Sequence, residues 1–324
     1  MVAYSSKCQV SSAKSEVMFE KKSNLLSSKD FTKEEILKIM KKAEKMLPYA
    51  RKEKVSDEMK GKVLATLFYE PSTRTRFSFE TAMLRLGGSV ISNAQMKETS
   101  SAKKGESLSD TGRVVSCFAD IIAMRHSEAG SVAELAKGAT VPVINAGDGA
   151  NDHPTQGLLD AFTIFKEFGG VDGLTVGMVG DLKNGRVPHS QCELLKNFKG
   201  LKFVFVSPKE LAMPREIVNK LKNCGHEVFE TVDLDKVIGE LDVLACTRIQ
   251  QERFASENEY LQYKGVYVID AGLMKLLKKT AIVMHPLPRI DELLPEVDSD
   301  LRAKYFEQGT NVVAVRMAAM EMWL

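Results

Sequence analysis

Short apolar runs alternate along the chain with stretches in which apolar residues recur at helical spacing. The first set of runs comprises Val63–Tyr69, Ser89–Ser92, Asp120–Arg125 and Val141–Asn145. The second set comprises Leu174–Gly180, Lys202–Ser207, Val243–Thr247, Val266–Asp270 and Ala281–His285. Apolar strands that alternate with helices are typical of parallel sheets covered on both faces. The pattern predicts an α/β protein with two doubly wound domains, each with a central, mainly parallel sheet flanked by helices.

The ends and the middle of this pattern set the expected domain bounds. Residues 1–28 are rich in Ser and Lys and lack a sustained apolar period, which predicts a flexible N-terminal tail. The pair Gly169-Gly170 favours a domain boundary. We therefore expect a first domain over residues 29–168 and a second over residues 169–310. The apolar segment 311–324 is expected to pack back on the first domain.

Composition narrows the class of protein. With 324 residues and 44% hydrophobic content the chain can bury a large core and is expected to form two domains. Its net charge of +2 indicates neither nucleic-acid nor membrane binding. The five cysteines are scattered without a CxxC pair, which argues against a structural zinc and a disulfide framework and favours a reducing compartment. We expect a cytoplasmic enzyme. An organellar leader is the less favoured interpretation, because the tail contains Glu16 and Glu20 and no arginine.

The stretch from Glu70 to Glu80 combines the end of a predicted strand, a turn and the start of a predicted helix. A helix N-terminus presents free backbone N–H groups and the positive end of the helix dipole. Five consecutive residues add hydroxyl and guanidinium donors there: Ser72, Thr73, Arg74, Thr75 and Arg76. The simpler alternative is an N-capped helix with two solvated arginines. Because arginine and hydroxyl donors match phosphate oxygens, the stretch predicts a phosphate-binding site.

Polar residues also follow the other predicted strands. In open parallel sheets, ligands bind beyond the carboxyl ends of the strands. The clusters at those ends are Arg125-His126, the loop 145–156 with His153 and Gln156, the segment 180–186, Arg248 with Gln250, and Pro286-Leu287-Pro288. A satisfied buried histidine or a surface ion pair explains any one of them singly. Five clusters at equivalent strand ends outweigh these simpler explanations and indicate a ligand site.

Three separated motifs resemble the signature segments of the transcarbamoylase family: Glu70-Pro-Ser-Thr-Arg-Thr-Arg76, His153-Pro-Thr-Gln156 and His285-Pro-Leu-Pro-Arg289. Segments 180–186 and 247–250 resemble the aspartate-specific members. The HCLP motif of the ornithine-specific members is absent. The resemblance implies transfer of a carbamoyl group from carbamoyl phosphate to L-aspartate, the committed step of pyrimidine synthesis. This chemistry requires no metal or cofactor, since carbamoyl phosphate is already a reactive acyl phosphate.

The resemblance also implies a role for each matching residue. The phosphate is expected to contact Ser72, Thr73, Arg74, Thr75 and Arg125. The carbonyl oxygen is expected near Thr75, Arg125 and His153, which with Arg74 form the catalytic set. The carbamoyl NH2 group is expected to meet Gln156 and the backbone carbonyls of Pro286 and Leu287. The aspartate carboxylates are expected to meet Arg186, Arg248, Gln250, Lys104 and Leu287.

The segment 99–107 resembles the family loop that enters the site of a neighbouring subunit. Ser100 and Lys104 would contact substrate there, which implies a homotrimer with shared active sites. The resemblance does not decide whether the trimer is part of a larger assembly. Without the family, the same segment is a solvated basic turn. Glu70 and Arg253 are candidate charges for bridging the domains. Two alternative functions remain: a transcarbamoylase for another amine acceptor, and a catalytically silent assembly paralogue.

Overall fold

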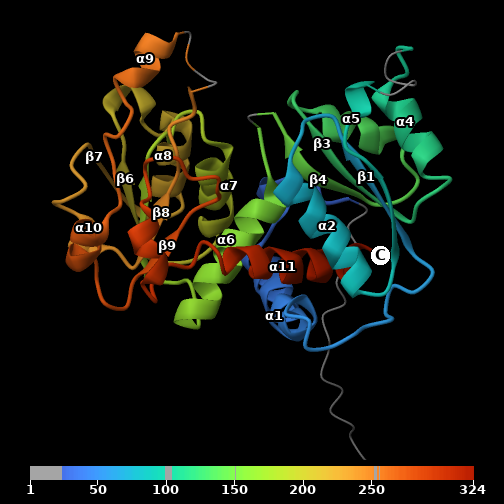
Figure 1. Cartoon of the computed structure of the whole chain (residues 1–324), viewed down its shortest axis with the longest axis horizontal. Coiled ribbons are helices and arrows are strands. Elements are labelled where there is room, and N and C mark those ends of the chain that lie inside the picture. The colour runs from blue at the N-terminus through green and yellow to red at the C-terminus, as the bar shows by residue number, and fades with distance from the viewer. Residues whose placement is uncertain (1–23, 99–103, 150, 252–253, 255) are drawn as a thin grey trace, which may run out of the picture.

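Two α/β units, each built on a parallel sheet, lie side by side in the computed structural model of the chain (Figure 1). The structure describes residues 24–98, 104–149, 151–251, 254 and 256–324. The first sheet has the strand order β2-β1-β3-β4, with parallel pairing throughout. Its strands are β1 (Val63–Phe68), β2 (Ser89–Asn93), β3 (Ile121–His126) and β4 (Val143–Asp148). All four coincide with predicted strands to within a few residues.

The second sheet has the order β7-β6-β5-β8-β9 and is also parallel. Its strands are β5 (Thr175–Val179), β6 (Lys202–Val206), β7 (Glu227–Thr231), β8 (Val243–Cys246) and β9 (Ile282–Met284). The predicted strand Val266–Asp270 is wrong, because only Ile269 forms an isolated bridge there, to Leu293. Strand β7 was not predicted, since this edge strand is partly exposed and contains polar residues in place of an apolar run.

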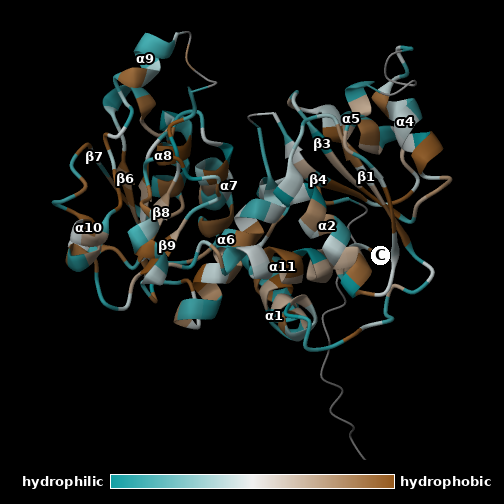
Figure 2. Cartoon of the chain, viewed as in Figure 1, coloured by the Kyte–Doolittle hydropathy of each residue, from teal (hydrophilic) through white to brown (hydrophobic). Residues whose placement is uncertain are grey.

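Helices cover both faces of the first sheet. Side chains of β1 alternate between the faces, so Leu64 and Phe68 join one apolar core while Ala65 and Leu67 join another. The helices on the first face are α1 (Lys33–Ala50), α2 (Thr73–Arg85), α6 (Pro154–Phe168) and α11 (Gln308–Trp323). Those on the second face are α4 (Leu108–Val115) and α5 (Ser131–Gly138). Figure 2 shows the apolar strands enclosed between these helices.

The two units share one continuous apolar core. It runs from Phe162 of α6 to Leu194 of α7 and on to Phe203 of β6. The helices of the second unit are α7 (Arg186–Leu195), α8 (Arg215–Asn223), α9 (Glu257–Leu261) and α10 (Ala271–Leu276). Short 3-10 turns lie at Ser28–Asp30, Met96–Glu98, Lys209–Leu211, Ile238–Glu240 and Pro295–Ser299. This packing places the carboxyl ends of both sheets beside one shared cleft.

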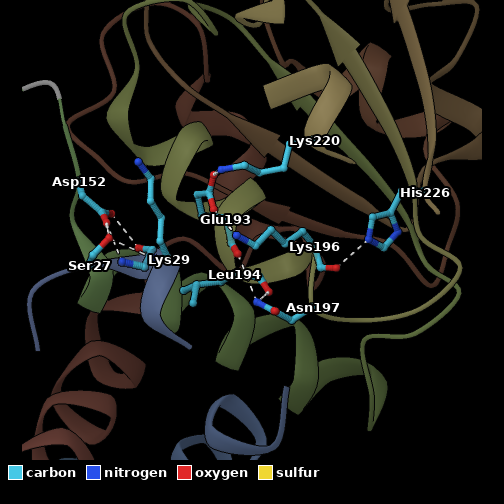
Figure 3. A network of polar contacts seen from close by, with 10 residues as sticks. Ser27, Lys29, Asp152, Glu193, Leu194, Lys196, Asn197, Lys220 and His226 are labelled. Carbon is cyan, nitrogen blue, oxygen red and sulfur yellow. Dashed lines mark hydrogen bonds and ion pairs between the residues drawn. The ribbon is translucent and has the colours of Figure 1, made fainter. Parts of the chain in front are cut away.

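Residues 24–28 differ from the flexible tail that the sequence predicts. Leu25 is buried and forms a parallel bridge to β4. The hydroxyls of Ser27 and Ser28 donate to the buried carboxylate of Asp152 at 3.0 and 2.7 Å; Ser27 and Asp152 are drawn in Figure 3. The expectation is wrong for these residues because the carboxylate satisfies their polar groups. Residues 1–23 of the expected tail lie outside the described residues.

The last helix lies against the first unit. α11 begins at Gln308, slightly before the expected segment 311–324, and packs on α1, α2 and α6. Its final side chain, Trp323, is buried and meets Phe31 edge to face with ring centroids 6.3 Å apart. Within the part of the chain that the structure describes, no helix is both long and apolar enough to cross a membrane.

Candidate active site

A cleft of about 630 Å³ lies between the carboxyl ends of the two sheets, and a cavity of about 500 Å³ adjoins it. The predicted site residues that line the cleft are Ser72, Thr73, Arg74, Arg125, Arg186, Arg248, Gln250, Pro286 and Leu287. Those that line the adjoining cavity include Thr75, His153 and Gln156. The fold therefore gathers side chains from distant parts of the chain at one place. Lys104 is exposed and does not line either space, and Ser100 and Arg253 lie outside the described residues.

The N-terminus of α2 forms one wall of the cleft. Ser72 occupies the N-cap position without a side-chain capping bond; its hydroxyl instead donates to Oγ1 of Thr75 at 2.9 Å. The first helical backbone bond runs from the N–H of Arg76 to the carbonyl of Ser72. The backbone N–H groups of residues 73–75 are therefore left for a ligand. This geometry favours a phosphate site over the alternative of an ordinary N-capped helix.

Glu70 links the arginines of the two units. Its Oε2 lies 3.1 Å from Nη2 of Arg125, at the end of β3, and 3.7 Å from Nη2 of Arg186, the first residue of α7. Burial, followed by the charge of Arg186, lowers the pKa of Arg125 to about 10, and Glu70 offsets part of that shift. Glu70 of the first unit thus reaches the second unit through its contact with Arg186. The cleft remains electropositive, because Arg74 and Arg248 also line it.

A glycine allows these groups to converge. Gly147 has a φ of +112°, and a Cβ atom there would lie 3.0 Å from Nη1 of Arg125 and 3.5 Å from His153. Any side chain at this position would displace one of them. His153 follows at the N-cap of α6 and is only 4% exposed. Burial, and then the nearby arginine charges, hold its pKa well below 6.5, so the imidazole is neutral at neutral pH.

The loop after β9 contributes backbone carbonyl groups to the cleft. His285 organises it: its Nδ1 accepts the N–H of Leu287 at 2.8 Å, which leaves Nε2–H to donate to Glu292 at 2.8 Å. Leu287 has a φ of +53°, unusual for a residue with a side chain. Its carbonyl oxygen accepts a 2.7 Å hydrogen bond from Nη2 of Arg74. These contacts hold the carbonyl of Leu287 beside the first unit.

Arg316 of α11 is a site residue that the sequence analysis missed. It lines the adjoining cavity, is 1% exposed, donates to the carbonyl of Thr75 at 2.8 Å and stacks 4.0 Å from the centre of the Phe79 ring. Burial, with a contribution from Arg125, lowers its pKa to about 9, and among the described residues no carboxylate pairs with it. The signal in the sequence was a lone arginine within the apolar segment 312–323. A buried cation next to the first turn of α2 adds positive potential at the candidate anion site.

Two parallel-sheet units that share an arginine-rich cleft at their strand ends define an α/β enzyme for anionic substrates. Residues 23–166 match the model of the aspartate/ornithine carbamoyltransferase carbamoyl-P binding domain, and residues 172–323 match the Asp/Orn binding domain of the same family. The chain belongs to the aspartate/ornithine carbamoyltransferase family.

Relatives of known structure or name support this assignment. The aspartate carbamoyltransferase catalytic subunit of Thermococcus kodakarensis is 50% identical over 301 residues, covering 93% of this chain and 96% of that protein. The catalytic subunit of M. jannaschii aspartate transcarbamoylase superposes with a TM-score of 0.87 at 47% identity, over 93% of this chain and 98% of that one. The Trypanosoma cruzi enzyme in complex with carbamoyl phosphate and aspartate superposes with a TM-score of 0.87 at 39% identity, over 94% and 98%.

Proposed function

We propose that this chain catalyses the aspartate carbamoyltransferase reaction: carbamoyl phosphate and L-aspartate give N-carbamoyl-L-aspartate and phosphate, the committed step of pyrimidine synthesis. The observation that carries the proposal is the cleft itself. It places the free N-terminus of α2 opposite Arg186 and Arg248 of the second unit. A phosphate on one wall and a dicarboxylate on the other match those two sets of donors.

The first unit would bind carbamoyl phosphate. The N–H groups of residues 73–75, with Ser72, Arg74 and Arg125, would hold the phosphate. The carbonyl oxygen would lie near Thr75, Arg125 and the neutral imidazole of His153. Negative charge grows on that oxygen as the amine attacks, and donors fixed in advance stabilise it without reorganisation. The carbamoyl NH2 would donate to Gln156 and to the carbonyls of Pro286 and Leu287.

The second unit would hold L-aspartate through Arg186, Arg248 and Gln250. Bringing two oriented substrates together supplies much of the rate in a reaction that needs no covalent intermediate. The amine forms the new C–N bond as the C–O bond to phosphate breaks, and the departing phosphate can take the proton of the amine. The bounds 29–168 and 169–310 for these two binding domains are part of this proposal.

Phosphate release tests the function directly. Purified protein is incubated with carbamoyl phosphate alone, with L-aspartate added, and with ornithine added in its place. The proposal expects phosphate release above background with aspartate and not with ornithine. Stimulation by ornithine would favour a transcarbamoylase for another acceptor. Release that neither amine stimulates would favour the silent paralogue.

The active unit in this proposal is a homotrimer with shared sites. Lys104 lies away from the cleft of its own chain, which is what a loop that serves a neighbour requires. Closed cyclic symmetry lets each subunit give one loop, with Ser100 and Lys104, and receive one. Chains with Lys104→Ala and chains with Arg74→Ala should each be nearly inactive. Mixed trimers contain interfaces that pair an intact loop with an intact cleft, so mixing after dissociation should restore part of the activity.

Mass spectrometry of the mixed trimers controls that complementation experiment. If the chains exchange and no activity returns, Lys104 is a solvated loop lysine and the sites are not shared.

We also place the protein in the cytoplasm. All four cysteines in the described part of the chain are unpaired, as a reducing compartment favours. Residues 1–28 fused to a fluorescent reporter should leave it in the cytoplasm, and import of the reporter into an organelle would contradict this location.

A further inference from the structure

Asp160 is a buried carboxyl group that the proposed chemistry does not use. It lies on α6 one turn beyond Gln156 and is 1% exposed. Its Oδ1 accepts two side-chain amides, Nε2 of Gln156 at 3.0 Å and Nε2 of Gln308 at 2.7 Å. Its Oδ2 has no partner within hydrogen-bond distance among the described residues, although the side-chain amide of Gln191 on α7 is near enough to lower the pKa of Asp160. Gln308 begins α11, so this carboxyl group joins the helix that carries Gln156 to the helix that carries Arg316.

Backbone chemistry fixes the direction of these hydrogen bonds. The backbone N–H of His285 donates to Oε1 of Gln308 at 3.1 Å, and a backbone N–H can only donate. The amide of Gln308 must therefore turn its Nε2 toward Asp160, and Asp160 must accept. Because Oδ1 of Asp160 is an acceptor, Gln156 also presents its Nε2 to it. The amide oxygen of Gln156 is then left for the cavity that this residue lines.

We propose that Asp160 is a positioning residue that sets substrate specificity: it orients Gln156 so that an amide oxygen, and not an amide NH2, faces the carbamoyl group. The inference rests on the proposed function. The same hydrogen-bonded chain starts at His285, next to the backbone carbonyls of Pro286 and Leu287. The amide oxygen of Gln156 and the carbonyl oxygens of Pro286 and Leu287 would then all present hydrogen-bond acceptors to the substrate. A carbamoyl NH2 satisfies acceptors, whereas an acetyl CH3 leaves them unpaired, so the site rejects acetyl phosphate.

Burial raises the pKa of Asp160 to about 8, so the carboxyl group is mostly protonated at neutral pH. A neutral carboxylic acid still offers a carbonyl oxygen as acceptor. Asn has the same shape, and two converging N–H donors would draw its carbonyl oxygen to the position of Oδ1. Leu has nearly the same size and no acceptor. Asp160→Asn and Asp160→Leu therefore form a matched pair that separates hydrogen bonding from packing.

The measured quantity is the ratio of kcat/KM for carbamoyl phosphate to that for acetyl phosphate, with L-aspartate as the acceptor. With acetyl phosphate the amine attacks the acetyl carbon, the C–O bond to phosphate breaks, and N-acetyl-L-aspartate forms as the amine loses a proton. We expect Asp160→Leu to lower the ratio by about tenfold or more. Asp160→Asn should hold it within about threefold of the wild type.

A general loss of packing would lower both rates together and leave the ratio unchanged. Thr163→Val controls for this, because Thr163 is buried one turn further along α6 and bonds Leu159 and Asn311 away from the site. It should lower the melting temperature without moving the ratio. If Asp160→Leu does not fold, Gln308→Leu removes the amide that fixes Asp160, and it should also lower the ratio.

Two outcomes would overturn the inference: an unchanged ratio in Asp160→Leu or Gln308→Leu, or an equal fall of the ratio in Asp160→Asn and Asp160→Leu. Both outcomes are distinct from failure of the proposed function. If the proposed function fails, the wild-type protein itself does not transfer the carbamoyl group to L-aspartate.

Discussion

Nη2 of Arg74 lies 2.7 Å from the carbonyl oxygen of Leu287, although the two residues are 213 positions apart in the chain. This hydrogen bond connects the N-terminus of α2 in the first unit to the loop after β9 in the second. Burial, and then the charge of Arg248, lower the pKa of Arg74, which places both guanidinium groups in one electropositive space. The walls proposed for the phosphate and the carbamoyl group are thus in direct contact.

Arg74 is expected to be essential for turnover. Arg74→Ala removes a charged donor to the leaving phosphate and the contact to Leu287, so turnover should fall by about a hundredfold or more. Arg85→Ala, at the other end of α2, is the control and should stay near the wild-type rate. Steady-state kinetics of both variants checks this. A folded Arg74→Ala protein with a near-normal rate would show that the phosphate lies elsewhere.

Arg248→Ala separates the two substrates. It should weaken aspartate binding by about tenfold to a hundredfold, the usual cost of a lost charge-assisted hydrogen bond, while carbamoyl phosphate binding changes little. Calorimetric titration of each ligand measures both effects. Arg215→Ala is the control, since Arg215 is exposed on α8 and pairs with Glu230. Equal weakening of both ligands by Arg248→Ala would refute the division of binding between the two units.

The burial of Arg316 leads us to expect that phosphate stabilises the folded protein. The buried guanidinium has no acidic partner among the described residues, so an anion bound above it relieves the cost of its charge. Saturating inorganic phosphate should raise the melting temperature of the wild-type protein. In Arg316→Met, which keeps similar bulk, that rise should fall by about half or more. Thermal melts with and without phosphate measure it, and an equal rise in both proteins would exclude Arg316 from the anion site.

The raised pKa of Asp160 leads us to expect that the free energy of unfolding depends on pH. Its pKa of about 8 in the folded protein exceeds the ordinary value of 3.8, so between these values the folded state holds a proton that the unfolded state has lost. The free energy of unfolding should therefore fall as pH rises from about 5 to about 8, by up to about 1.4 kcal/mol per pH unit, and level off above pH 8. Asp160→Asn removes this contribution.

Urea unfolding of the wild type and of Asp160→Asn at pH 6 and pH 8.5 provides the comparison. The variant should gain stability relative to the wild type at the higher pH. A difference between the two proteins that does not change with pH would show that Asp160 is ionised throughout.

Local sequence patterns predict the fold well where every residue of a segment has the same surroundings, as in a strand that is buried on both faces. The apolar run Val63–Tyr69 becomes the buried strand β1, and Arg74, Arg125 and Arg248, which the sequence places at a helix start and at strand ends, line one cleft. The edge strand β7 gives no such signal, because half of its surroundings are water. Arg316 and Asp160 are also hidden from motif reasoning. Their importance depends on which helices pack together, and that is a property of the tertiary structure.

Competition between acceptors shows which amine receives the carbamoyl group. Wild-type protein is given carbamoyl phosphate labelled with carbon-13 at the carbonyl, together with equal concentrations of L-aspartate and L-ornithine, and NMR follows the labelled carbon. If the chain is an aspartate carbamoyltransferase, the label moves into N-carbamoyl-L-aspartate as an equal amount of phosphate appears, with no carbamoylated ornithine. Label in ornithine, or label lost only to the products of spontaneous breakdown, would contradict the proposed function.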